Sequence, residues 1–87
     1  MATYLISYEI QSNRTRTIMD SLIQKLGEST QITSTLWALK TEAPAKELRD
    51  ILREQVNAGD RIMVVKSGRE AAWHNILGNN QWVADNF

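Results

Sequence analysis

The stretch T-Y-L-I-S-Y-E-I at residues 3–10 alternates two kinds of side chain. Successive side chains of an extended strand point to opposite faces, so this stretch predicts a strand with two different faces. One face is apolar and is expected to pack on helices; it consists of Tyr4, Ile6, Tyr8 and Ile10. The other face is half polar and consists of Thr3, Leu5, Ser7 and Glu9. Glu9 is the only carboxylate among the first nineteen residues and is therefore the first candidate for a chemical role.

A four-residue apolar repeat after this strand predicts a helix. The repeat consists of Ile18, Leu22 and Leu26. Residues 11–15 are expected to form a polar turn before the helix. Thr17, which has capping spacing with Asp20, or alternatively Thr15, is expected to cap the start of the helix. Gly27 is expected to end it.

The middle of the chain predicts two further strands and a second helix. Residues 29–32 and 35–40 are rich in Thr, Ile, Leu and Trp, which favour strands, and residues 33–34 are expected to form the bend between them. Pro44 suits the first turn of a helix because its missing N–H has no intrahelical partner there. The apolar stripe of this helix consists of Leu48, Ile51, Leu52 and Val56.

The last third of the chain predicts one more strand and a helical tail. Residues 62–65 form a continuous apolar run, which is typical of a strand covered on both sides. Residues 69–77 resemble a short helix, and residues 81–87 are expected to add a final helical turn.

Strand–helix–strand occurring twice, with right-handed crossovers, predicts a ferredoxin-like βαββαβ fold of the α+β class. The sheet is expected to have four antiparallel strands, with both helices on one face and a short helical C-terminal tail. The opposite face is then bare, and it carries Leu5, Ser7 and Glu9. A half-apolar bare sheet face favours contact with a second copy of the chain, so we expect a homodimer.

The length and composition of the chain restrict the classes of protein to which it can belong. The 87 residues predict a single domain covering residues 1–87. The chain has no cysteine, which fits a reducing compartment and excludes disulfides and thiolate metal sites. It has no charged leader followed by an apolar run, and no stretch approaches the roughly 20 apolar residues that cross a bilayer. We therefore expect a soluble, cytoplasmic protein with no membrane partner.

Charge is balanced, with ten Lys plus Arg against ten Asp plus Glu. Dedicated nucleic-acid-binding domains usually carry a basic excess, so a neutral chain needs a local basic patch to bind a polyanion. Neutrality also removes the repulsion that keeps copies apart, which favours self-association.

Four stretches within residues 3–66 carry a family resemblance: Y-L-I-S-Y-E-I, N-R-T-R, Q-I-T-S-T-L-W-A-L and D-R-I-M-V-V. They resemble the small CRISPR-associated adaptation dimer (Cas-two-like) family and the related ferredoxin-like ribonuclease toxins. The resemblance implies a homodimer in which one carboxylate per chain, at the end of the first strand, faces its counterpart near the two-fold axis. It also implies a divalent metal there, with phosphodiester cleavage in some members and non-catalytic DNA scaffolding in others. The matching position here is Glu9, where the family ordinarily has Asp.

Glu9 is thus both the candidate catalytic residue and the candidate metal ligand. Mg²⁺ takes oxygen ligands and usually keeps several waters beside one or two protein carboxylates. One Glu9 is too few, whereas two Glu9 side chains related by the dimer axis suffice for an ion that positions water at a phosphodiester. The alternative is a structural ion pair between Glu9 and Arg14 or Arg16.

Basic residues near two strand ends are the candidate nucleic-acid contacts. Arg14 and Arg16 follow the first strand, and Lys66 and Arg69 follow the last. Guanidinium groups suit bidentate contacts to phosphate. The alternative is that all four are solvated turn residues. The first functional hypothesis is therefore an RNA- or DNA-associated homodimer with metal-dependent nuclease activity, and the second is a non-catalytic interaction or dimerisation module.

Overall fold

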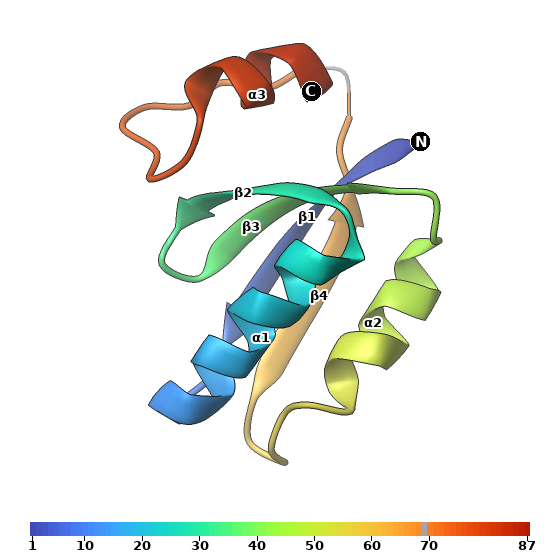
Figure 1. Cartoon of the computed structure of the whole chain (residues 1–87), viewed down its shortest axis with the longest axis vertical. Helices are drawn as coiled ribbons and strands as arrows, with labels where there is room; N and C mark the ends of the chain where they lie inside the picture. The colour runs from blue at the N-terminus through green and yellow to red at the C-terminus, as the bar shows by residue number, and fades with distance from the viewer. Residues whose placement is uncertain (69) are drawn as a thin grey trace.

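The computed structural model describes residues 1–68 and 70–87, and Figure 1 shows how its helices and strands are arranged. The order of elements is the predicted one, with a helix after the last strand. The strands are β1 (Ala2–Glu9), β2 (Glu28–Thr33), β3 (Leu36–Thr41) and β4 (Arg61–Lys66). The helices are α1 (Asn13–Leu26), α2 (Ala45–Arg53) and α3 (Asn80–Asn86).

The sheet has the strand order β2-β3-β1-β4, and every neighbouring pair is antiparallel. This confirms the predicted ferredoxin-like topology. β1 lies inside the sheet, where Ile6 has Trp37 of β3 on one side and Val64 of β4 on the other. The strand that contains the candidate carboxylate is therefore held along both of its edges.

Helices α1 and α2 cover one face of the sheet (Figure 1). The predicted apolar face of β1 is buried beneath them, because its side chains alternate toward the helices. The core consists of Tyr4, Ile6, Tyr8, Ile10, Met19, Ile23, Trp37, Leu39, Leu48 and Leu52. None of the helices in the described part of the chain is both long and apolar enough to cross a membrane.

Helix α1 begins earlier than the sequence predicted. Ser12 is its N-cap, and the Ser12 side chain accepts a hydrogen bond from the Thr15 backbone N–H at 3.2 Å. The predicted caps, Thr15 and Thr17, were wrong because both lie inside the helix. As a consequence, the residues from Asn13 onward belong to the helix and not to a polar turn.

The predicted helix at residues 69–77 is absent from its described residues, 70–77, which have no helical structure. The backbone N–H of Leu77 instead donates to the carbonyl oxygen of Ile32 in β2 at 3.0 Å, and Asn75 has a positive φ of 55°. Contact with the sheet has thus overridden the local helical pattern. The final helical turn does form, as α3, and Asn79 caps its start.

The tail covers part of the sheet face that was predicted to be bare. The Thr3 hydroxyl donates to the Asn86 carbonyl at 2.9 Å, and the Asn79 backbone N–H donates to the Thr30 hydroxyl at 2.9 Å. Val83 of α3 is buried, and so is Ala38 on this face of β3. Figure 1 shows α3 beside the N-terminal end of β1, so the covered half of the face is the half far from Glu9.

The other half of this face remains open. Met63 is 63% exposed and Val65 is 45% exposed, although the apolar run of β4 was predicted to be covered on both sides. That prediction was wrong for one side of β4. Helix α2 packs on the other side of β4, whereas α3 is bonded to β1 and β2 and leaves Met63 and Val65 uncovered. We call Leu5, Leu36, Met63 and Val65 the open apolar patch; Leu5 and Leu36 are half-buried.

Candidate functional site at the end of β1

Glu9 is the last residue of β1 and lies on the open side of the sheet, as predicted. The antiparallel register places Arg61, the first residue of β4, directly across from it. Oε1 of Glu9 accepts a hydrogen bond from Nη1 of Arg61, and the two side chains are 68% and 78% exposed. The alternative pairing of Glu9 with Arg14 or Arg16 was wrong, because Arg61 is the ion-pair partner of Glu9.

A shallow depression adjoins this ion pair, lined by Ser7, Tyr8, Glu9, Thr35, Arg61, Ile62 and Met63. The lining residues Ser7, Glu9 and Thr35 carry two hydroxyl groups and one carboxylate. Such oxygen atoms are the hard ligands that Mg²⁺ prefers. The Arg61 guanidinium contacts the same carboxylate, so an ion bound to Glu9 would have to displace it. Across residues 1–68 and 70–87, no three His, Asp or Glu side chains are grouped to hold a metal ion. Glu9 is the single carboxylate among the described residues that line this depression.

The predicted phosphate-contacting residues are not all brought together. Arg14 and Arg16 lie at the start of α1, just beyond the end of β1 that carries Glu9. Lys66 lies across from Tyr4, which is about 17 Å along β1 from Glu9. β4 runs antiparallel to β1, so its end was wrongly grouped with the α1 arginines. Arg69 lies outside the described residues.

Arg16 lines a second depression that borders the first. The two depressions share Tyr8 and Thr35, and the second also contains Asn13 and Asp20. Arg16 donates a hydrogen bond from Nη2 to the Asn13 side chain. The arginine set at this end of the molecule is thus Arg14 and Arg16 from α1 together with Arg61 from β4, which the sequence analysis did not single out.

Asp20 joins the helix layer to the sheet. Its Oδ1 accepts a hydrogen bond from the Tyr8 hydroxyl at 2.5 Å and another from Trp37 Nε1 at 2.9 Å. Burial, and then the hydrogen bond to the Asp20 carboxylate, raise the pKa of Tyr8 to about 12. The spacing of Asp20 from Thr17 predicted a helix cap, so this role of Asp20 was not predicted. A signal existed, because buried Tyr and Trp usually need a polar partner for their O–H and N–H groups.

The raised pKa of Tyr8 predicts a loss of stability at high pH. The unfolded side chain loses its proton near its ordinary pKa of 10.0, whereas the folded side chain keeps it up to about pH 12. The stabilisation from this group is therefore complete below pH 10.0 and is lost as the pH rises through 12, with a total of about 3 kcal/mol. Urea unfolding from about pH 9 to about pH 12 measures it, and Tyr8→Phe is the control. An equal alkaline loss in Tyr8→Phe would contradict the assignment.

The comparisons with known proteins support the fold alone. No protein-family model matches the sequence, and no curated protein matches it at a significant level. Among solved structures, the chain is similar to the hypothetical protein TT1823 from Thermus thermophilus, with a TM-score of 0.69 and 19% sequence identity. The match covers 90% of this chain and 94% of that chain. A likeness at this level of identity shows a shared fold over nearly the whole of both chains.

Proposed function

We propose that this chain is a nucleic-acid-associated homodimer, similar in plan to the CRISPR adaptation dimer family, and that Glu9 binds a divalent metal near its two-fold axis. The observation that carries the proposal is the position of Glu9, exposed at the rim of the open apolar patch. Contact between the patches of two copies buries Met63 and Val65. The same contact brings the end of β1 from each copy toward the end of the other.

In this dimer, the charged side chains near the end of β1 have different roles. The two Glu9 carboxylates hold Mg²⁺, which when bound supplies an activated water and stabilises charge on a phosphodiester. Arg61, once released from Glu9, is available to contact a phosphate oxygen through its guanidinium fork. Arg14 and Arg16 extend the cationic surface along α1, where they bind further phosphates.

A second function, a non-catalytic dimerisation module, is favoured by the ion pair between Glu9 and Arg61. The guanidinium already neutralises the carboxylate within one chain, so Glu9 needs no metal. In the dimer the same two residues can exchange partners, with Glu9 of each copy bound to Arg61 of the other. The open apolar patch and this self-complementary charge pair then make one isologous interface.

Incubation with single- and double-stranded RNA and DNA, with and without Mg²⁺, separates the two functions. We expect Mg²⁺-dependent cleavage that is lost in Glu9→Gln and retained in Glu28→Gln, which changes an exposed carboxylate at the start of β2. Salt-sensitive binding without cleavage would leave a nucleic-acid scaffold. Neither cleavage nor binding, together with a dimer in sedimentation, would leave the interaction module.

Sedimentation of the same proteins tests the assembly itself. The wild-type chain is expected to be a dimer at micromolar concentration, and Met63→Glu is expected to shift it to a monomer because it places a charge within the patch. A wild-type monomer at this concentration would contradict both functions.

A further inference from the structure

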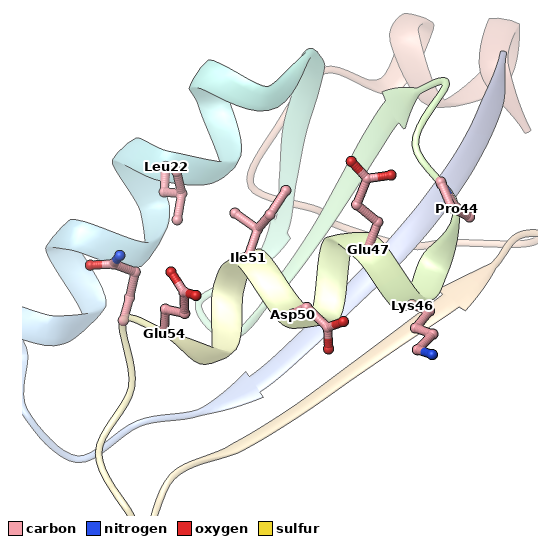
Figure 2. Close-up of a pocket in the computed structure, with 8 residues that line it drawn as sticks. Leu22, Pro44, Lys46, Glu47, Asp50, Ile51 and Glu54 are labelled. Atoms are coloured by element: carbon pink, nitrogen blue, oxygen red, sulfur yellow. The ribbon is translucent and has the colours of Figure 1, made fainter.

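A groove runs between α1 and α2, on the opposite side of the sheet from Glu9. Two adjoining depressions form it and share Leu22 and Gln55. Its apolar floor consists of Ile18, Leu22, Pro44 and Ile51. Ile18 is 41% exposed, while Leu22 and Ile51 are half-buried, so the floor is accessible from solvent. Figure 2 shows Leu22 from α1 and Ile51 from α2 reaching into the space between the two helices.

The two walls of the groove differ in charge. In Figure 2 Glu47, Ile51 and Glu54 project from the side of α2 nearer α1, whereas Lys46 and Asp50 project from its outer side. The α1 wall is uncharged at Thr17 and Ser21 and ends at Lys25 (Figure 1 gives its direction). The α2 wall of the groove therefore carries Glu47, Asp50 and Glu54 against the cation Lys46, while the α1 wall is mostly neutral.

Charge is segregated around α2. Residues three or four apart lie on one side of a helix, so Glu47, Ile51 and Glu54 share a side, and Arg49 and Arg53 share another. Both nitrogens of the Arg49 fork contact Asp50, which reduces the charge at that outer position. Among the described residues Glu47 and Glu54 form no ion pair, and Lys46 is the one cation of α2 that lines the groove, so carboxylates outnumber cations on this wall.

We propose that this groove binds a cationic amphipathic helix of a partner protein. Apolar residues of the helix, spaced three or four apart, fill the floor between Ile18 and Ile51, as in other helix-in-groove complexes. Lys or Arg residues along one flank of the helix pair with Glu47 and Glu54. The nine residues of α2 make the groove about 14 Å long, which accommodates two to three turns of helix. The neutral α1 wall fixes the orientation, since only one flank of the partner meets carboxylates.

A fluorescein-labelled Leu/Lys amphipathic peptide of about 14 residues, capped at both ends, is the probe for anisotropy titration. We expect saturable binding by the wild-type chain, weakened about fivefold or more in the double variant Glu47→Gln/Glu54→Gln. Ile18→Ser should weaken it as well, because it removes an exposed part of the floor. The matched control is Arg49→Gln/Arg53→Gln, which alters the same helix outside the groove and should bind at least as tightly as the wild type.

Two further measurements keep the test decisive. A Leu/Glu peptide of the same length should not bind, and amide chemical-shift changes caused by the Leu/Lys peptide should map to α1 and α2. Circular dichroism confirms that each variant is folded. Failure of the wild-type chain to bind, equal binding by Glu47→Gln/Glu54→Gln, or shifts centred on Met63 and Val65 would each overturn the proposal, without bearing on the function proposed for Glu9.

Discussion

Asp20→Ala is expected to lower the free energy of unfolding by about 3 kcal/mol, a large part of the stability of a domain this small. The substitution removes the acceptor of two hydrogen bonds, one from Tyr8 and one from Trp37. Both donors belong to buried side chains of the core. Their O–H and N–H groups would lose the carboxylate that satisfies them, and an unsatisfied buried donor costs more than a hydrogen bond contributes.

Urea denaturation of Asp20→Ala, Asp20→Asn and Tyr8→Phe measures this effect. Asp20→Asn keeps a side-chain oxygen that can accept both bonds, so it should lose less than half as much stability as Asp20→Ala. Tyr8→Phe removes one of the two donors together with its partner bond and should fall between wild type and Asp20→Ala. A change within about 0.5 kcal/mol for Asp20→Ala, typical of an unconnected surface site, would contradict this role.

Gly78→Ala is expected to detach the C-terminal tail from the sheet. A Cβ at this position would collide with the Thr30 hydroxyl and with the backbone oxygen of Gln31, neither of which can move without disturbing β2. The hydrogen bonds that Leu77 and Asn79 donate to β2 would break with it. We expect a loss of about 2 kcal/mol, since overpacking a close contact costs about 1–3 kcal/mol.

Limited proteolysis and amide hydrogen exchange report on this detachment directly. Cleavage between residues 67 and 79 should become about tenfold faster or more, and the amides of Leu77 and Asn79 should lose their protection. Gly59→Ala is the matched control, because no atom lies within 4 Å of the position that its Cβ would take. Unchanged cleavage in Gly78→Ala would show that the tail does not depend on this contact.

The sequence predicted the sheet and its two faces well because alternation within a strand is a local property. Tyr4, Ile6 and Tyr8 are buried and Glu9 is exposed, as their spacing required. The helix at residues 69–77 was wrong for the opposite reason. Its apolar spacing was helical, but hydrogen bonds to a distant strand hold the end of that stretch, and such bonds are not visible in local periodicity.

The candidate site was predicted in part. Glu9 could be located from β1 alone, whereas its partner depends on the register between β1 and β4. The pairing of Arg61 with Glu9 and of Lys66 with Tyr4 follows once the direction of β4 is known. The predicted topology already implies this pairing, because an antiparallel neighbour of β1 starts near the end of β1. The link from Asp20 to Tyr8 and Trp37 required the packing of α1 on the sheet, which no sequence spacing specifies.

In the described part of the chain, β4 is the outermost strand on its side of the sheet. The unpaired N–H and C=O groups of an edge strand can pair with a strand of another copy, and repeated pairing of this kind builds a fibre. Here Arg61 and Lys66 stand at its two ends, and charged side chains on an edge strand hinder its pairing with another strand. Fibril growth along this edge is thereby discouraged, while association through the flat surface of the sheet carries no such penalty.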